Sequence, residues 1–188
     1  MRLFGTQRLE TDRLVLRRVS LDDAEPMFRN WASDPEVTKY LTWSPYRDVS
    51  GVESFIREQM ELWQRDDHYN WFIELKNIGE VIGSIGFVRY YEDIDSLELG
   101  YVIGRAWWGQ GIVPEALNAV IDFGFDVLGV NRIAAQHDVQ NPNSGKVMRK
   151  CGMTYEGTLR QAGKNNRGII DICQYSILKG EHVRTSRG

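Results

Sequence analysis

Residues 107–116 read W-W-G-Q-G-I-V-P-E-A, from Trp107 to Ala116. Two glycines flank one residue, and a proline and a glutamate then begin an apolar helix. Glycines let backbone N–H groups come close to a ligand, and the unpaired N–H groups and dipole of a helix N-terminus favour an anion. Pro114 suits the first helical turn, where an N–H group would have no partner. The segment indicates an anion-binding loop, and a plain turn before a helix is the alternative.

Hydrophobic periodicity on either side of this loop predicts a mixed α/β fold. Short apolar or alternating runs predict strands at residues 13–18, 71–75, 81–90, 97–103, 132–139, 153–160 and 169–178. Apolar residues at helical spacing predict helices at residues 20–32, 35–40, 50–63, 116–128 and 143–151. The last two strands are expected to close a hairpin over a polar loop at 161–168. One mixed sheet of about seven strands covered by helices would bury all these apolar faces.

The composition is that of an ordinary globular protein. The 188 residues are 42% hydrophobic and 26% charged, which suits one domain over residues 1–180 with residues 181–188 as a loose tail. A net charge of −3 gives no support for nucleic-acid binding. Cys151 and Cys173 form no metal-binding pattern and are expected to be buried free thiols. Because no signal peptide or membrane-spanning apolar run is found, we expect a cytoplasmic protein without metal or membrane contact.

Three features follow one another along this chain. Residues 97–101 read L-E-L-G-Y, an apolar strand with one acid, and the glycine loop and its helix come next. Residues 140–153 then read Q-N-P-N-S-G-K-V-M-R-K-C-G-M. With these features the chain resembles the GNAT N-acetyltransferases, specifically the branch related to ribosomal-protein N-terminal acetyltransferases (the RimJ/RimL type). The resemblance extends from L-E-T-D-R-L at residues 9–14 to the closing hairpin.

The resemblance implies a mixed but mostly antiparallel sheet in which two neighbouring strands splay apart. It implies acetyl-CoA as co-substrate, with the pantetheine arm in the gap and the pyrophosphate against the loop. The implied binding residues are Tyr101, Val102 and Ile103 in the strand and Trp108, Gly109, Gln110, Gly111, Ile112 and Val113 in the loop. Trp108 and Val113 depart from the family, which commonly has Gln or Arg and Gly or Ala there. The main-chain N–H donors remain in place, although the side chain of Val113 would narrow the space through which the pyrophosphate approaches the loop.

The later helix supplies further implied contacts. By the resemblance, Asn141 contacts the pantetheine arm, and Lys146 and Arg149 reach the nucleotide phosphates. Ser144 is implied to hydrogen-bond the cofactor sulfur and to help protonate the leaving thiolate. Each residue has a plainer alternative: Asn141 suits a helix N-cap, Ser144 a surface position, and the basic residues a solvated helix face.

A thioester is already activated, so a neutral amine attacks it directly without a covalent enzyme intermediate. An α-amino group has a pKa of ~7.7–8.0 and a lysine side chain a pKa of ~10.4, so an α-amine needs little help from the enzyme to lose its proton. Glu98 is the candidate general base, acting through one water, because an acid in an apolar strand is costly unless it is used. The alternative is that Glu98 faces solvent on the alternating side of the strand. A main-chain N–H near Tyr101–Ile103 would bind the carbonyl oxygen.

The acceptor amine stays open between a protein N-terminus and a small molecule. Several side chains are candidates to line its pocket, with core packing as the alternative: Asn30, Trp31, Trp43, Tyr90 and Tyr101. A dinucleotide-binding fold is excluded because Pro114 occupies the third glycine position. The alternative function is a non-catalytic acyl-CoA-binding sensor or structural partner with the same fold. Dimers are frequent in this branch, so a homodimer is a further expectation.

Overall fold

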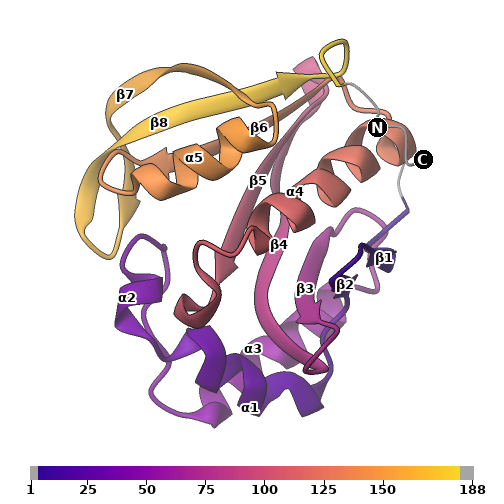
Figure 1. Ribbon diagram of the computed structural model, residues 1–188, viewed down its shortest axis with the longest axis vertical. Helices are drawn as coiled ribbons and strands as arrows, with labels where there is room; N and C mark the ends of the chain where they lie inside the picture. Colours follow the sequence, from indigo (N-terminus) through magenta and orange to yellow (C-terminus); the bar gives the residue numbers. More distant parts are fainter. Residues whose placement is uncertain (1–3, 183–188) are drawn as a thin grey trace.

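The described part of the computed structural model, residues 4–182, contains one eight-stranded sheet (Figure 1). Its strands are β1 (Leu9–Glu10), β2 (Leu14–Arg17), β3 (Asn70–Leu75), β4 (Glu80–Tyr91), β5 (Ser96–Ile103), β6 (Arg132–Asp138), β7 (Thr154–Asn165) and β8 (Gly168–Leu178). In space they follow the order β1-β2-β3-β4-β5-β6-β8-β7, and neighbours are antiparallel except β5 and β6. The predicted mixed, mostly antiparallel sheet is confirmed, with one strand more than expected.

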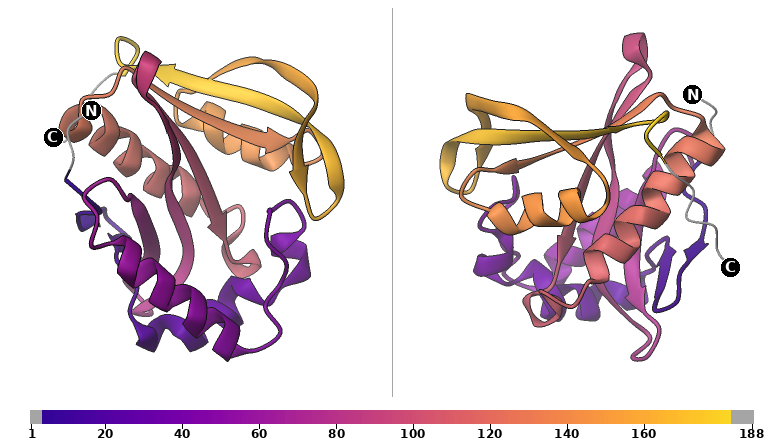
Figure 2. Two further views of the ribbon diagram at one scale, coloured as in Figure 1. Left: turned by 180° about the vertical axis from the view of Figure 1, so that it is seen from behind. Right: turned by 45° about the horizontal axis from the view of Figure 1, so that its top comes forward.

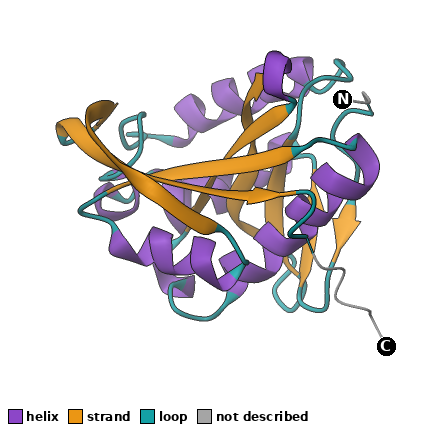
Figure 3. Cartoon of the chain, turned by 90° about the horizontal axis from the view of Figure 1, so that it is seen from above, coloured by secondary structure: helices purple, strands orange, loops and turns teal. Residues whose placement is uncertain are grey.

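Helices lie on both faces of this sheet (Figures 2 and 3). They are α1 (Ala24–Met27), α2 (Pro35–Thr38), α3 (Val49–Leu62), α4 (Ile112–Asp122) and α5 (Pro142–Lys150). One buried cluster joins α4 and α5 to the sheet, and a second joins α1 and α3 to Phe72 and Val81 on the opposite face. Among the helices of residues 4–182, none has the length and apolar character needed to cross a membrane.

The N-terminal helical run differs from the single helix predicted at 20–32. It begins as a 3₁₀ turn at Leu21–Asp23, continues as α1 and ends as a π-helical turn at Phe28–Ala32. Apolar spacing predicts the run correctly, but it does not fix the hydrogen-bond step within it. The predicted helix at 116–128 likewise begins earlier, as α4, and ends in a π-helical turn before Gly129, whose φ of 77° terminates it as expected.

β5 and β6 define an opening in the sheet. They pair in parallel only where residues 96–99 lie beside residues 132–135. Beyond this point β5 stays with β4 as far as Ile103, which lies opposite Gly83, while β6 follows β8 as far as Asp138. The two strands therefore diverge, as Figure 1 shows, and the predicted splayed pair is confirmed.

The closing hairpin is longer than predicted. β7 and β8 continue through the predicted polar loop at 161–168 until only Asn166 and Arg167 join them. β7 is the last strand of the sheet and is exposed along most of its length, so polar residues are tolerated in it. A bulge around Gln161, with a φ of 50°, interrupts its pairing. The prediction of a loop is wrong because exposed edge strands and loops share the same polarity.

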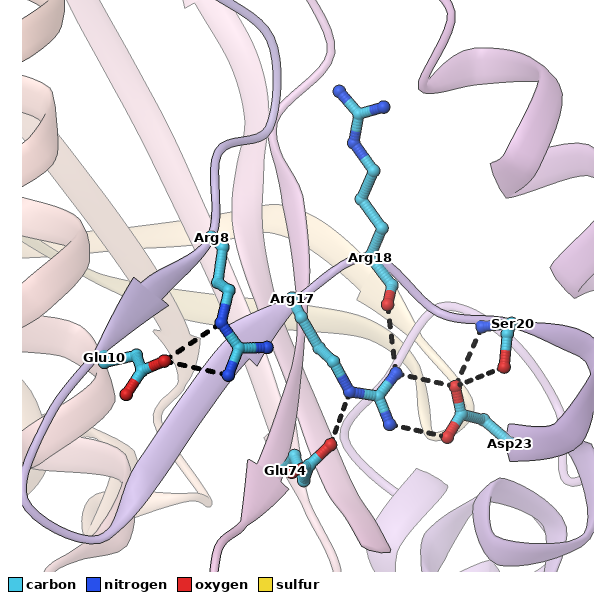
Figure 4. Close-up of polar contacts among 7 residues, drawn as sticks. All are labelled: Arg8, Glu10, Arg17, Arg18, Ser20, Asp23 and Glu74. Carbon is cyan, nitrogen blue, oxygen red and sulfur yellow. Dashed lines mark hydrogen bonds and ion pairs between the residues drawn. The ribbon is translucent and has the colours of Figure 1, made fainter. Parts of the chain in front are cut away.

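One arginine ties the end of β2 to the N-terminal helical run (Figure 4). Arg17 donates from Nε to Glu74 of β3 at 2.5 Å and from Nη1 and Nη2 to the two oxygens of Asp23 at 2.8 Å each. Asp23 also accepts from the N–H of Ser20 at 2.8 Å. Burial raises the pKa of Asp23, but hydrogen bonds from Arg17 and Ser20 lower it further than burial raises it. Arg17 thus joins the first turn of the N-terminal helical run to the sheet by bridging two carboxylates.

The segment predicted as a loose tail begins at residue 181. Its first two residues are described: the N–H of Glu181 donates to the carbonyl of Leu178 at 2.9 Å, and the His182 ring lies 5.0 Å from that of Phe125 between centroids. The remaining tail residues, 183–188, lie outside the described residues.

A glycine allows α5 to pack closely on β6. A Cβ added at Gly145 would lie 2.6 Å from Nε2 of His137 and 3.0 Å from the hydroxyl of Tyr175. Alanine normally stabilises a helix interior over glycine by about 1 kcal/mol, but this contact reverses the sign. We expect Gly145→Ala to lower the free energy of unfolding by about 1–3 kcal/mol, measured by chemical denaturation. Asn143→Ala, on the exposed side of α5, is the control, and a Gly145→Ala variant as stable as that control would contradict the packing.

Candidate active site

The opening between β5 and β6 brings together the segments that the sequence singles out. The end of β5 borders it on one side, the glycine loop follows β5, and α5 begins beyond the end of β6 (Figure 1). Because β5 has no partner on this side beyond Leu99, the main chain of Tyr101, Val102 and Ile103 lies along the opening. This is where the resemblance places the pantetheine arm.

The glycine loop has the backbone that an anion site requires. Gly109 and Gly111 have φ values of 75° and 74°, in the left-handed region that favours glycine. No atom of the described residues lies within 4 Å of where a Cβ of Gly109 would be, so the loop is open there. Gly111 is the N-cap of α4 and has no side chain to accept from the N–H groups of the first turn. Those N–H groups are left for water or for an anionic ligand.

The side chains of the loop turn away from this backbone surface. Trp108, which is 48% exposed, donates from Nε1 to the carbonyl of Ile103 at 3.0 Å. Gln110 donates from Nε2 to the carbonyl of Ala106 at 2.8 Å. Val113 is only 7% exposed and, like Ile112, packs into the core under α4. The two residues that depart from the family pattern therefore brace the loop or the core.

Tyr101 and Ser144 meet between β5 and α5. The Tyr101 hydroxyl lies 2.7 Å from Oγ of Ser144 and donates to the Ser144 carbonyl at 3.1 Å. Burial raises the pKa of Tyr101, so its phenol stays protonated at neutral pH. Ser144 is half-buried, and its hydroxyl is held on the side of α5 that faces β5. A plain surface position does not account for this contact.

The remaining predicted residues of α5 have mixed surroundings. Asn141 is the N-cap of α5, but its side chain makes no capping hydrogen bond to the described residues, so a cap alone does not explain it. Lys146 is exposed, and its Nζ donates to Oδ1 of Asn143 at 3.3 Å, as expected of a solvated residue on a helix. Arg149 donates to the hydroxyl of Tyr175 at 2.6 Å. The side-chain amide of Asn141 is therefore not used for capping, whereas the exposed Arg149 is held by the ring and hydroxyl of Tyr175.

Glu98 lies on the other face of the sheet. Leu97 and Leu99 are buried on the α4 side, so by strand alternation Glu98 points away from Tyr101 and Ser144. The carboxylate accepts from the Tyr91 hydroxyl and from Nε2 of Gln136, each at 2.8 Å. Gln136 is the first residue of β6 beyond its pairing with β5. Glu98 is thus held at the narrow end of the opening, half-buried rather than fully solvated.

Most candidates for the acceptor pocket have structural partners. Asn30 donates from Nδ2 to the carbonyl of Val81 at 2.8 Å, and Tyr90 donates to Asp95 at 2.9 Å. Trp31 is 1% exposed and packs in the cluster under α1. Trp43 also packs against the second core cluster, with its ring 5.8 Å from that of Tyr46 between centroids, and its carbonyl accepts from Nδ2 of Asn166 at 2.7 Å.

The tip of the β7–β8 hairpin is not among the residues predicted for the site. Asn166 also donates from Nδ2 to the carbonyl of Thr38 at 2.9 Å and from its N–H to that of Leu41 at 3.0 Å. The tip therefore reaches from the β8 side of the opening to the segment that follows α2. An Asn-Asn-Arg-Gly sequence is a turn signal, but no local pattern shows what such a turn will contact.

Asp138 is a second residue that sequence reasoning missed. It is buried at the end of β6 and accepts from the N–H of Gln140 at 2.8 Å, from Asn165 at 2.9 Å and from Arg167 at 2.9 Å. Burial raises the pKa of Asp138, but these three hydrogen bonds lower it to below its usual value. The ionised carboxylate fixes the hairpin tip to the strand that borders the opening.

Metal ligands are not gathered anywhere in the described part of the chain, where no group of three or more His, Cys, Asp or Glu side chains could hold an ion. Of the two free cysteines, Cys151 is buried and Cys173 is only half-buried. The expectation of two buried thiols is therefore wrong for Cys173, whose Sγ lies 3.4 Å from Oγ1 of Thr158 near the exposed edge of the sheet.

Known proteins share this arrangement over most of their length. Residues 13–154 match the acetyltransferase (GNAT) domain. The chain is 37% identical over 177 residues to an uncharacterized N-acetyltransferase, p20, of Bacillus licheniformis, a match that covers 94% of this chain and 99% of the relative. It is 33% identical over 170 residues to a ribosomal-protein-serine acetyltransferase of Escherichia coli (strain K12), covering 89% and 94%.

A solved structure extends the comparison to three dimensions. The microcin C7 self immunity acetyltransferase MccE, crystallised in complex with acetyl-CoA and AMP, matches with a TM-score of 0.79 and 26% identity. The match covers 89% of this chain and 93% of the chain in that crystal structure. The splayed sheet, the glycine loop and these relatives agree: the chain belongs to the GNAT family of N-acetyltransferases.

Proposed function

We propose that this chain transfers the acetyl group of acetyl-CoA to a primary amine by direct attack on the thioester. The observation that carries the proposal is the Tyr101–Ser144 pair, placed beside an opening that the glycine loop also borders. The similarity to MccE, whose structure holds acetyl-CoA, supports the choice of acyl donor. A cytoplasmic location is part of the proposal.

The chain's own groups fit the acyl donor in the following way. The N–H groups of Gly111, Ile112 and Val113 at the start of α4 bind the pyrophosphate. The pantetheine arm lies along the unpaired edge of β5, with the side-chain amide of Asn141 beside it. A main-chain N–H of Tyr101–Ile103 binds the carbonyl oxygen as negative charge develops there.

The Tyr101–Ser144 pair serves the leaving group. The amine nitrogen forms a bond to the carbonyl carbon, the carbon–sulfur bond breaks, and the electron pair goes to sulfur. Ser144 passes its proton to that thiolate and regains one from solvent, which also takes up the proton lost by the amine. The Tyr101 hydroxyl turns from the Ser144 carbonyl to Oγ and hydrogen-bonds it while the proton is transferred. Because the phenol stays protonated, it is available as a donor at every turnover.

Glu98 serves the attacking amine. It accepts two hydrogen bonds that hold it in place, from Tyr91 and Gln136, at the narrow end of the opening. Because it lies on the face opposite to Ser144, a water in the gap between the strands relays the amine proton to it. The acid and base functions are thereby kept on opposite sides of the sheet.

The acceptor is a protein N-terminal α-amine or a small-molecule amine. To test the function, thiol release from acetyl-CoA is followed with a panel of peptides and small amines, beside calorimetric titration of acetyl-CoA. We expect binding, and turnover with at least one amine. Binding without turnover on any amine would favour the alternative, a non-catalytic acyl-CoA-binding sensor.

The loop assignment is tested by Gly111→Phe. A side chain at this position would be strained by the φ of 74°, and its Cβ would lie 3.6 Å from Nη2 of Arg13, so it would distort the loop that presents the N–H groups. We expect a loss of acetyl-CoA affinity of about 100-fold or more, measured by calorimetry. Gly79→Phe, in the β3–β4 turn with a φ of 65° and open space around it, controls for backbone strain. If both variants bind like the wild type, the loop does not hold the pyrophosphate.

Ser144→Ala tests the thiol side of the reaction. Protonation of sulfur matters mainly as the thiolate forms, so we expect kcat to fall by about tenfold to 100-fold while the dissociation constant of acetyl-CoA changes little. Tyr101→Phe should lower kcat by a smaller factor, again with little change in acetyl-CoA affinity. The kcat of the double variant should be no lower than that of Ser144→Ala alone. A change in binding with kcat unaltered would make Ser144 a cofactor contact only.

Glu98→Gln tests the base. The substitution keeps the shape but removes the basic site, so we expect turnover to fall about 100-fold. Raising the pH should partly rescue the variant, because more of the amine is then already neutral. Tyr91→Phe removes only a partner of the carboxylate and should retain most of the turnover. Wild-type turnover with an unchanged pH profile in Glu98→Gln would leave Glu98 a structural carboxylate.

A further inference from the structure

Glu115 lies behind the glycine loop, in the first turn of α4. Its Oε1 accepts from the hydroxyl of Thr11 at 2.5 Å and from the N–H of Arg13 at 2.9 Å. Its Oε2 accepts from Nε of Arg13 at 2.6 Å. The carboxylate is 20% exposed and belongs to a helix that begins about a hundred residues after the segment that binds it. A segment near the N-terminus is therefore fastened to the start of α4.

The same arginine reaches the loop itself. Nη1 of Arg13 donates to the carbonyl of Gln110 at 3.0 Å. Nη2 lies 3.6 Å from where a Cβ of Gly111 would be, so the guanidinium rests against the backbone of Gly111. One planar group thus joins the helix carboxylate to the peptide that links Gln110 and Gly111.

This contact determines which way that peptide faces. In a trans peptide the carbonyl and the following N–H point in opposite directions. When Arg13 holds the Gln110 carbonyl on its own side of the loop, the N–H of Gly111 must point to the other side. A glycine on each side of Gln110 would otherwise leave this peptide free to rotate, because glycine loses more conformational freedom on ordering than other residues do.

The charges of Glu115 and Arg13 also favour anion binding at the loop. A carboxylate in the first turn interacts favourably with the helix dipole, but by itself it would repel a pyrophosphate bound at that turn. Arg13 balances the charge of Glu115, and burial, which raises the pKa of Glu115, is outweighed by the hydrogen bonds from Thr11 and Arg13 that lower it. Glu115 therefore stays ionised at neutral pH, and the guanidinium of Arg13 leaves the anion site without a net negative neighbour.

We propose that Arg13, held by Glu115, is a positioning residue that orients the Gln110–Gly111 peptide for binding of the CoA pyrophosphate. The inference rests on the proposed function only in taking CoA as the ligand. Arg13 is 45% exposed, and an ion pair of this exposure contributes little to global stability. Removal of the Arg13 side chain is therefore expected to increase the mobility of the glycine loop and to change the melting temperature little.

The test compares Arg13→Met with Arg8→Met. Arg8 forms a pair of the same chemistry with Glu10, at 2.8 Å and more exposed, in the same N-terminal segment (Figure 4). Hydrogen–deuterium exchange of peptides covering residues 105–115 is measured in the ligand-free proteins. We expect faster exchange in Arg13→Met alone, and a rise of about tenfold in the dissociation constant of CoA by calorimetry.

A second ligand separates positioning from general damage. Pantetheine lacks the pyrophosphate, so its affinity, measured by chemical-shift titration, should be the same in the wild type, Arg13→Met and Arg8→Met. Equal losses for CoA and pantetheine in Arg13→Met would overturn the proposal, as would unchanged exchange and unchanged CoA affinity. Should Arg13→Met fail to fold, Arg13→Lys decides by the same measurements, because one ammonium cannot bridge Glu115 and the Gln110 carbonyl. A wild type that does not bind CoA would refute the proposed function, and loop exchange would still test the positioning.

Discussion

The site depends on one constraint in the sheet: the parallel pairing of β5 and β6 stops at Leu99 and Ala135. From there β5 is committed to β4 and β6 to β8, so their facing edges have main-chain groups without a strand partner. Main-chain N–H and C=O groups along such an edge need a ligand or water as hydrogen-bond partner. The glycine loop, Tyr101 and the N-terminus of α5 all take their positions from this divergence.

Local sequence patterns were sufficient for most of the elements and for part of the site. Apolar periodicity located β2 to β6 because each of these strands packs at least one face in the core. The glycine pair and the Asn-Pro-Asn-Ser segment marked the starts of α4 and α5 because helix ends have strong residue preferences. β1, with two residues, is too short to show any period.

Local sequence patterns did not predict contacts between segments that are distant in the sequence. Alternation offered a solvent-facing Glu98 as the alternative to a catalytic one, but it did not show that Ser144 would lie beside Tyr101 while Gln136 binds Glu98. Charged residues were the least predictable, because a charge on an exposed helix and a charge in a network look alike in sequence. Asp138 and Glu115 each have three or more hydrogen-bond donors that no local pattern shows.

The hairpin tip at Asn166 also bears on how the protein forms during synthesis. It binds Thr38 and Trp43 across sequence separations of 128 and 123 residues. Contacts of such long range form late, since a large loop must close before they contribute. The β1–β5 strands and the glycine loop are synthesised before the tip exists. A nascent chain can therefore assemble the glycine loop early, whereas the wide end of the opening acquires its final shape only after the β7–β8 hairpin has been synthesised.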